Sequence, residues 1–593
     1  MVTSPLAMAR SWLPRPAKDD GDHIATPAVD GVDWLVAIAA LLFPLAYFDA
    51  FFVPSFTPRM ALVVLLLPAG AFRLIRAAGS RDAASLAALA MLVVCAAASL
   101  VADIPLWNLR GGFGRESSLV FIGGFFALWA LARETTYDGR RLVAAASLFG
   151  LAATGLVGFV QLIVEPAGFL QMIASRPSGL MVNPVYFGPS MAGAAVFVTH
   201  LLVRRGVGEW LAAGAIELFV PCANLSGSRA GMIGLAIGVA AGLAIAEAAR
   251  SRIIIGACVA VGVLGSTAVT RLSDGRDTLE RASGGSDGRW QIWNYAWSAF
   301  RDRPLRGHGL GQFRPAVQTH FEPEFVSEYL AGPGGVAWPD AHNVIVQYTV
   351  VGGMLTTASL LAFAILAGRA ADGPGAWATL ALTVSWLLQP VTLVTAPIAA
   401  IWLGVASANP RSTQATEPSH EDERSAVATD TDQVPPARVE RRTDGLLVTV
   451  GALLAFTPLG LDRQLDRAID RGDAAAFANW AEVAPDDPVV AVTAAGFNTR
   501  QGSRSVGLEW SARAVQLEPR DAVTNTDHAI RLFDAGLADE SVEAIRTALE
   551  VDPYNPYALR VAAAIGTAVD DENLIDTART RGCLIIEELC DVG

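Results

Sequence analysis

A few arginine and histidine side chains are the residues of this sequence best suited to chemistry. Arg229 lies in the segment SGSRAG, Arg289 lies in GRWQIW, and His342 lies in DAHN. Guanidinium groups bind phosphate oxygens through paired, charge-assisted hydrogen bonds, each of about 1.5–3 kcal/mol. A neutral imidazole nearby could take a proton from an attacking hydroxyl. Several arginines beside one histidine therefore suit a substrate that carries a pyrophosphate.

The elements that must position these residues are membrane helices. The chain has 593 residues, of which 52% are hydrophobic and only 17% are charged, whereas soluble domains are about 25% charged. A helix needs about 20 apolar residues to cross the hydrocarbon core. Thirteen apolar runs are candidates: 34–52, 60–76, 83–102, 117–133, 142–164, 184–203, 208–225, 231–249, 252–270, 343–367, 376–391, 393–408 and 443–461. We predict an all-α membrane bundle of about 12–13 spans over residues 33–408 and 443–461. The pair at 376–408 is interrupted by Pro390 and Pro397.

Arginine and lysine residues in the short loops predict the orientation of the spans, because such residues favour the cytoplasmic side. With the tail 1–32 inside, alternate loops collect most of these residues: Arg10, Arg15, Lys18, Arg73, Arg76, Arg81, Arg133, Arg140, Arg141, Arg204, Arg205, Arg250, Arg252, Arg369, Arg438, Arg441 and Arg442. The opposite loops keep a smaller set against this preference: Arg59, Arg110, Arg115, Arg176, Arg229 and a cluster from Arg271 to Arg314. Something other than topology is expected to keep them there. The odd number of spans puts residues 462–593 on this outer side.

The longest outer loop, 271–341, contains an expected amphipathic helix. Trp290, Trp293 and Trp297 follow helical spacing. Such a helix either lies in the membrane interface or packs on the spans. The following GHGLG segment lacks the Gly-Lys-Ser/Thr of a P-loop, and no strand precedes it as in a dinucleotide site.

Plainer explanations stand beside the chemical ones. A lone histidine at the edge of a span is more often structural than catalytic, and Arg229 could be incidental to a capped turn. No Asp-x-Asp pair occurs in the outer loops between spans, so a metal bound to such a pair is not indicated. The arginines could instead supply the leaving group's counter-charge. The net charge of −13 argues against a nucleic-acid partner.

The C-terminal region repeats with a period of 34 residues. Pro485, Pro519 and Pro553 are equally spaced in the segments AEVAPDDP, AVQLEPRD and ALEVDPYNP. This period is typical of tetratricopeptide repeats, which form α-solenoids. Such a domain over 462–593 binds a partner or only packs on the membrane part. The linker 409–442 is rich in Ser, Thr, Pro and charge and is expected to be flexible. Cys583 and Cys590 could pair in an oxidising compartment, although one unbroken helix would hold them about 10 Å apart.

Several segments together resemble the O-antigen ligase and O-antigen polymerase superfamily. SGSRAG, GRWQIWNYAWSAFRDRPLRGHGLGQF and HNVIVQYTVVGG look like its successive motifs. RPSGLMVNPVYFG and LRGGFGRESSL resemble its earlier outer segments, which here carry Arg176 and Arg115. The resemblance covers roughly residues 106–408, and the attached repeat domain is similar to one branch of the family.

The resemblance implies a GT-C-like, inverting, metal-independent glycosyltransferase without a cofactor. Such an enzyme moves a glycan from a polyprenyl-pyrophosphate carrier to an acceptor outside the cytoplasmic membrane. By the same resemblance, Arg229 and Arg289 would hold the pyrophosphate and His342 would activate or orient the acceptor, with Arg115 and Arg176 as further pyrophosphate ligands. One departure is Val351, which stands about where the family often has a glutamate.

Three activities remain open within the family: ligation to a lipid or wall acceptor, polymerisation of repeat units, and protein O-glycosylation. We favour ligation. A transporter of lipid-linked glycans would also need arginines, but in a central cavity reached from both sides. A membrane scaffold with an active solenoid would leave the outer arginines unexplained.

Overall fold

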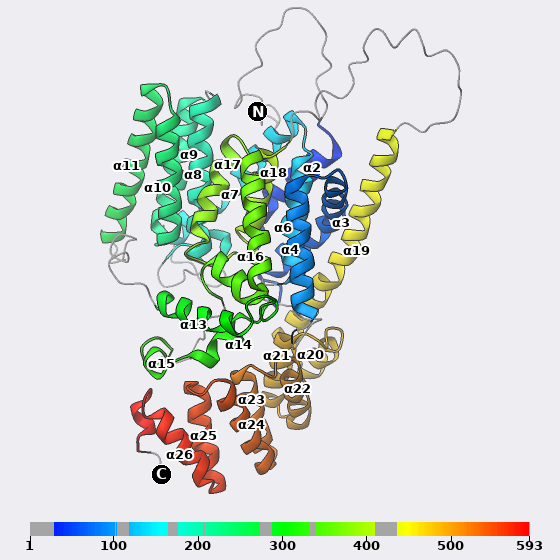
Figure 1. The fold of residues 1–593 in the computed structure, drawn as a ribbon, viewed down its shortest axis with the longest axis vertical. Helices are drawn as coiled ribbons and strands as arrows, with labels where there is room; N and C mark the ends of the chain where they lie inside the picture. Colours follow the sequence, from blue (N-terminus) through cyan, green and yellow to red (C-terminus); the bar gives the residue numbers. More distant parts are fainter. Residues whose placement is uncertain are drawn as a thin grey trace, which may run out of the picture.

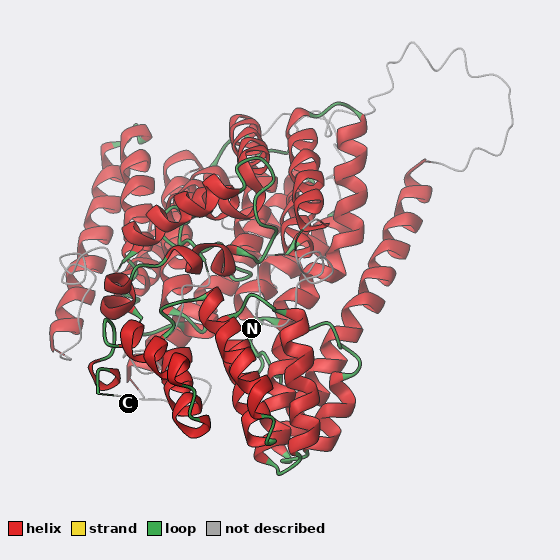
Figure 2. Ribbon diagram, turned by 60° about the horizontal axis from the view of Figure 1, so that its bottom comes forward, coloured by secondary structure: helices red, strands yellow, loops and turns green. Residues whose placement is uncertain are grey.

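The computed structural model describes residues 29–100, 102, 118–163, 176–205, 208–272, 288–330, 340–408 and 436–591. Helices form the regular structure of these residues, which contain no β-strand (Figure 2), so the all-α prediction is confirmed. Each of the thirteen apolar runs contains a helix: α2 (Gly31–Leu45), α3 (Thr57–Gly79), α4 (Ala83–Leu100), α6 (Leu119–Arg133), α7 (Tyr137–Ile163), α8 (Pro184–Arg205), α9 (Glu209–Leu225), α10 (Arg229–Ile245), α11 (Ala249–Leu272), α16 (Val344–Ala370), α17 (Pro374–Ser385), α18 (Ala396–Ala406) and α19 (Pro436–Asp470).

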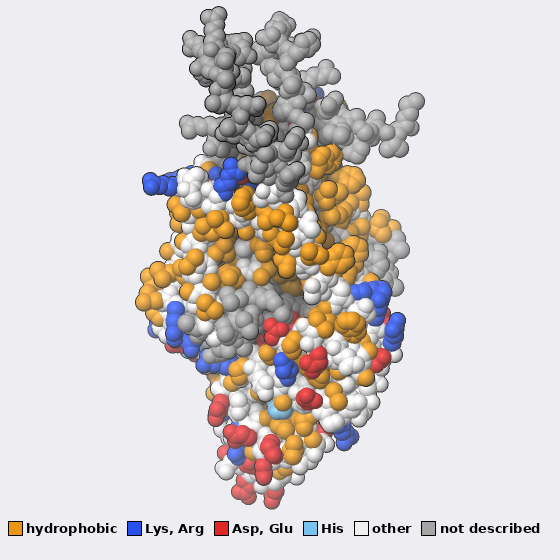
Figure 3. Space-filling view, turned by 90° about the vertical axis from the view of Figure 1, so that its right-hand side faces the viewer, with side chains coloured by type: hydrophobic (Ala, Val, Ile, Leu, Met, Phe, Trp, Pro, Cys, Tyr) orange, Lys and Arg blue, Asp and Glu red, His pale blue; other side chains and the backbone are white. Residues whose placement is uncertain are grey.

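Seven of the described helices contain stretches long and apolar enough to cross a membrane: Thr57–Gly79, Ala83–Leu100, Tyr137–Ile163, Pro184–Val203, Ala249–Arg271, Val344–Ala370 and Thr443–Asp470. The other six are shorter and run alongside them in one bundle (Figure 1). The protein is therefore a multi-pass helical membrane protein, and crossing by the shorter helices remains a prediction. In Figure 3 hydrophobic side chains cover much of the bundle, whereas charged side chains gather on the C-terminal helices.

The loops of the bundle gather at two ends (Figure 1). At the end where α2 begins, here called the tail end, Asp82 pairs with Arg133 at 2.9 Å. Arg73 pairs there with Glu134 and with Asp444 of α19, at 2.8 Å each. The opposite end, where α10 and α16 begin, is here called the site end. The alternation of loops expected from the arginine pattern agrees with this arrangement.

Small residues allow the bundle helices to approach closely. A Cβ atom on Gly70 of α3 would lie 2.3 Å from the carbonyl oxygen of Ala127 in α6. Close backbone approach at glycine is a common way of packing helices in a membrane, where no hydrophobic effect drives helices together.

Four short helices cover the site end: α13 (Arg289–Asp302), α14 (Phe313–Val317), η3 (Gln318–His320) and α15 (Pro323–Tyr329) (Figure 1). The predicted amphipathic helix corresponds to α13. Its Ile292, Tyr295 and Phe300 are buried, and the Tyr295 ring lies 5.3 Å from that of Phe325 in α15. Trp290 and Trp297 remain exposed. The helix therefore packs on the protein with one face and leaves a tryptophan face uncovered.

The GHGLG segment docks onto a break in α16. Gly353 has φ 70° and ψ −172° inside this helix, which frees backbone groups of the preceding turn. The amides of His308 and Gly309 donate to the carbonyls of Val350 and Val351 at 3.1 and 2.8 Å. A Cβ on Gly353 would lie 2.3 Å from the carbonyl oxygen of Leu305. The glycine-rich segment thus supplies hydrogen-bond donors to the backbone carbonyls that the break leaves without a helical partner. Backbone groups within a membrane protein need such partners.

The C-terminal region consists of helices that pair with their neighbours: α20 (Ala474–Ala481), α21 (Pro488–Arg500), α22 (Arg504–Leu517), α23 (Ala522–Asp534), α24 (Ala538–Val551), α25 (Pro556–Val569) and α26 (Glu572–Gly582). Asp487, Asp521 and Asn555 cap α21, α23 and α25, each 34 residues after the last. The sequence period is therefore a period of helix pairs. The assignment to the tetratricopeptide type remains a prediction.

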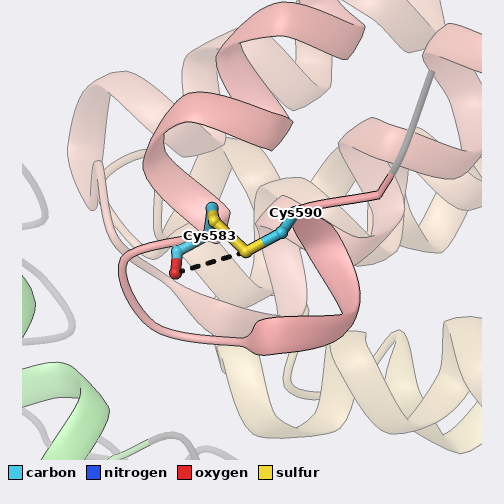
Figure 4. The surroundings of a disulfide bond; sticks show 2 residues. All are labelled: Cys583 and Cys590. Carbon is cyan, nitrogen blue, oxygen red and sulfur yellow. Dashed lines mark hydrogen bonds between the residues drawn. A yellow bond between two sulfur atoms is a disulfide. The ribbon is translucent and has the colours of Figure 1, made fainter.

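Cys583 and Cys590 form a disulfide bond with a Cα–Cα distance of 4.5 Å (Figure 4). The sequence left this pairing open. It forms because α26 ends at Gly582 and the following turn brings Cys590 back. Most of the predicted linker 409–442 lies outside the described residues, and its last part from Pro436 already belongs to α19.

The helix pairs pack against the site end. The Gln318 amide of η3 donates to the Arg520 carbonyl at 2.8 Å. Arg314 of α14 lies 3.5 Å from Asp521. This region therefore contacts the membrane part, and whether it also binds a partner stays a prediction.

Candidate functional site

Arg229 is placed by the short turn between α9 and α10. It is the first residue of α10, and the Ser228 side chain caps this helix by accepting from the Gly231 amide at 3.2 Å. Gly231 is needed because a Cβ there would lie 2.8 Å from the backbone of Gly188 in α8. The turn is therefore both capped, as the plainer explanation held, and fixed against a second helix.

Arg176 reaches the same turn from a distant segment. Its Nε donates to the carbonyl of Ser226 at 2.6 Å. The Ser226 hydroxyl in turn accepts from the Ser228 amide at 3.1 Å. Two of the predicted arginines, Arg176 and Arg229, are thus brought to one turn.

His342 lies immediately before α16 in a restricted conformation. Its φ is 49°, which is uncommon for a residue other than glycine. One carboxylate oxygen of Asp340, Oδ1, accepts from the His342 amide at 2.8 Å and lies 2.8 Å from the ring Nδ1. An Nδ1–H bonded to Asp340 leaves Nε2 as the basic nitrogen of the neutral ring. This tautomer suits a general base.

The end of α17 joins the Arg229 and His342 segments. The Ser385 hydroxyl donates to the Ala230 carbonyl at 3.0 Å. The Val344 amide donates to the Trp386 carbonyl at 2.8 Å, and the Asn343 side chain donates to the Leu387 carbonyl at 3.0 Å. Three consecutive residues at and just after the end of α17 therefore hold the starts of both α10 and α16.

Arg289 is joined to the same place through its own helix. It is the first residue of α13, after Gly288 in the left-handed conformation. One turn later, the Trp293 indole donates to the Ala341 carbonyl at 2.9 Å, and Ala341 precedes His342. The hydrogen bonds connect the four described candidates through the backbone of their neighbours.

Helix N-termini and candidate arginines occur together at the site end. Three helices, α10, α13 and α16, begin here. A helix N-terminus carries roughly half a positive charge and exposes amide hydrogens. Arg229 and Arg289 each add a guanidinium at such a start. Phosphate oxygens would find both the dipoles and the fork geometry that they prefer.

Sequence reasoning missed Asp340 and Ser385 as positioning residues. The spacing Asp-Ala-His could have indicated the first, because an aspartate side chain often bonds the amide two residues on. Nothing local distinguishes Ser385. Arg115 lies outside the described residues. Val351, where the family often has an acid, is fully buried at the α16 break. The assignment of the site itself remains a prediction.

Comparison with protein families supports the resemblance over part of the chain. Residues 216–361 match the family described as O-Antigen ligase. The bundle carries an O-antigen ligase family domain. The matched region includes Arg229, Arg289 and His342, whereas Arg176 precedes it. No curated protein matches the chain. Among the described residues of this multi-span protein, no three His, Cys, Asp or Glu side chains gather as a metal site, and metal independence stays a prediction.

Proposed function

We propose that this protein transfers a glycan from a polyprenyl-pyrophosphate carrier to an acceptor at the outer face of the cytoplasmic membrane. The observation that carries the proposal is the joining of three segments at the site end. Arg229 and Arg289 each begin a helix, and hydrogen bonds of 2.8–3.0 Å tie both helices to the segment around His342. The O-antigen ligase family domain covers all three residues.

The arginines would bind the donor. Arg229 and Arg289 hold the pyrophosphate, and Arg176 adds charge beside Arg229; by the family resemblance, Arg115 is a further candidate ligand of the pyrophosphate. As the bond to the sugar breaks, negative charge grows on the leaving pyrophosphate, and fixed guanidinium groups stabilise it without reorganisation. This role would otherwise fall to a metal ion, so the proposed reaction is independent of metal and cofactor.

His342 would activate the acceptor. Its Nε2 takes the proton from the acceptor hydroxyl, and the oxygen attacks the anomeric carbon of the donor sugar. The bond from that carbon to the pyrophosphate oxygen breaks, and its electron pair leaves with the polyprenyl pyrophosphate. A single displacement of this kind inverts the configuration at the anomeric carbon. Asp340 stabilises the imidazolium that forms.

Ligation to a lipid or wall acceptor is the favoured activity. Polymerisation of repeat units and protein O-glycosylation use the same donor and differ only in the acceptor. The GT-C-like bundle would present its site end to the outside. The Cys583–Cys590 disulfide supports this orientation, because such bonds persist mainly in oxidising compartments. The helix pairs, of tetratricopeptide type, would then lie outside and could bind an acceptor or a partner enzyme.

Transfer by the reconstituted full chain tests the proposal. A polyprenyl-pyrophosphate glycan is offered in proteoliposomes with chelator, together with lipid, glycan or peptide acceptors. We expect transfer to one acceptor class, and loss of transfer in His342→Ala with the thermal unfolding midpoint unchanged. Transfer that requires a divalent metal would contradict the mechanism. Movement of the donor across the membrane without transfer would favour a transporter, and no activity of either kind would favour a scaffold.

A further inference from the structure

Helix α13 presents an apolar face that the protein does not cover. Trp290 is 63% exposed and Trp297 is 58% exposed. They are seven residues apart, which is close to two helical turns, so they share a face. The opposite face packs through Tyr295, whose ring lies 5.4 Å from that of Phe321 and 5.3 Å from that of Phe325 in α15. Two large exposed indoles on a well-packed helix indicate contact with something other than this chain.

Exposed apolar side chains continue from α13 towards a membrane helix. Leu305, three residues after α13, is 64% exposed. The Met354 amide of α16 donates to the Pro304 carbonyl at 2.9 Å. Met354 and Leu355 are exposed on this candidate span. Exposed apolar side chains therefore occur on α13, on the segment that follows it, and on the candidate span that this segment contacts.

The arginine at the start of α13 indicates which kind of apolar molecule would bind along the tryptophan face. Trp290 directly follows Arg289, and its ring centroid lies 5.9 Å from that of Trp293. Trp293 is the residue whose indole binds the Ala341 carbonyl beside His342. A molecule bound along this face would thus carry an anionic group at Arg289 and a long hydrocarbon chain beyond it.

We propose that Trp290 and Trp297 bind the polyprenyl chain of the donor where it leaves the pyrophosphate held at Arg289. This inference rests on the proposed function for the identity of the donor. Indole rings bury large apolar area at low conformational cost, so they suit contact with a hydrocarbon chain that leaves water. The face makes donor binding depend on the length of the prenyl chain.

Chain-length dependence of KM and of binding tests this inference. The full chain in detergent-free nanodiscs is offered the same glycan on a long polyprenyl pyrophosphate or on farnesyl pyrophosphate. The wild type is expected to show a lower KM for the long chain. The double variant Trp290→Ala, Trp297→Ala is expected to reduce that preference by roughly ten-fold or more. Trp210→Ala is the matched control, since Trp210 is 88% exposed at the tail end.

A double variant that keeps the wild-type preference overturns the inference. Equal rises in KM for both donors overturn it too, because they indicate anchoring of α13 in bulk lipid. Binding of glycan-free polyprenyl and farnesyl pyrophosphate is measured in parallel. If the wild type transfers nothing but still binds the long chain more tightly through Trp290 and Trp297, the proposed function fails and the inference stands.

Discussion

Arg73 and Arg176 lie at opposite ends of the helix bundle and are held in different ways. Arg73, at the tail end, is buried and pairs with two carboxylates, Glu134 and Asp444. Arg176, at the site end, donates to the Ser226 carbonyl. A carbonyl oxygen is neutral, so this bond positions the guanidinium without cancelling its charge. The two arginines therefore differ in these contacts: carboxylates pair with Arg73, whereas the bond from Arg176 to Ser226 is to a neutral oxygen.

Arg59 adds a qualification to this contrast. It is fully buried near the site end and donates to the carbonyls of Phe43, Ser55 and Leu180. These bonds connect three separate segments. An arginine on the outer side is thus not by itself evidence for substrate binding, and helix starts such as those of Arg229 and Arg289 are the better indicator.

The largest expected effect is the loss of transfer on removing an arginine from a helix start. Arg229→Ala and Arg289→Ala should each lower kcat/KM by about 10²-fold or more, since a preorganised charge on the leaving group is lost. Arg73→Ala should leave transfer per folded molecule unchanged. Initial rates in proteoliposomes measure this difference. An equal loss of transfer in Arg73→Ala and in the two helix-start variants would show that arginines at the two ends do not differ in function.

Asp340→Asn should lower kcat by about 10–100-fold, because the orientation and tautomer of His342 depend on that carboxylate. A positioning role also predicts a displaced pH–rate profile, which a purely structural change would not produce. His342→Ala should be no less damaging than Asp340→Asn. A normal rate and pH profile in Asp340→Asn would leave His342 without its proposed tautomer.

Arg73→Ala should destabilise the bundle by about 2–3 kcal/mol, since it leaves Glu134 and Asp444 without their shared partner. Both carboxylates are partly exposed, which keeps the loss below that of a fully buried pair. Thermal unfolding in nanodiscs checks this value. A midpoint in Arg73→Ala equal to that of the wild type would contradict a structural role for this arginine.

Acid should affect the tail end and the C-terminal helices in opposite directions. Burial raises the pKa of Asp552 to about 6, despite an Asn555 hydrogen bond and the nearby Arg314. Its protonated form is favoured on folding, so the free energy of unfolding of these helices should rise by about 2 kcal/mol as the pH falls from about 7 to 4.

At the tail end, burial also acts on Asp82, but hydrogen bonds from Arg133 and Ser85 lower its pKa to about 2. The ionised Asp82 carboxylate should add about 1 kcal/mol to the free energy of unfolding above pH 4, and this stabilisation is lost towards pH 2.

Unfolding midpoints between pH 7 and 5 separate these two groups. Asp552→Asn should abolish the gain on acidification, whereas Asp82→Asn should leave it intact. If the unfolding midpoint of Asp552→Asn still rises on acidification, the stabilisation comes from another titrating group.

The fold was predictable where one local signal dominates. Long apolar runs predict helices because lipid leaves backbone groups no other partner, and all thirteen runs contain one. The period of 34 residues likewise recurs in the capping residues. The break at Gly353 was not predictable, because it depends on a loop some forty residues earlier in the chain. The disulfide was open for a different reason: it depends on the residue at which α26 ends, and helix ends are poorly defined by sequence patterns.

For the candidate site, the sequence indicated individual residues but not how their segments are joined, and the assignment of the site stays a prediction. Motif order indicated Arg229, Arg289 and His342, and the family match covers all three. Their connection through Ser385 and Trp386 joins segments that are distant in sequence, which no spacing rule reveals. Asp340 shows the reverse case, in which a local contact of the histidine was present in the quoted motif and was not recognised.

Binding of glycan-free polyprenyl pyrophosphate tests the central claim most directly, because it depends on neither the acceptor nor the sugar. Affinity is measured at low and high salt for the wild type and for Arg229→Ala, Arg289→Ala, with Arg73→Ala as control. We expect at least ten-fold weaker binding in the double variant, a smaller salt dependence, and wild-type affinity in the control. Wild-type affinity in the double variant would contradict the assignment of the site end to the donor pyrophosphate.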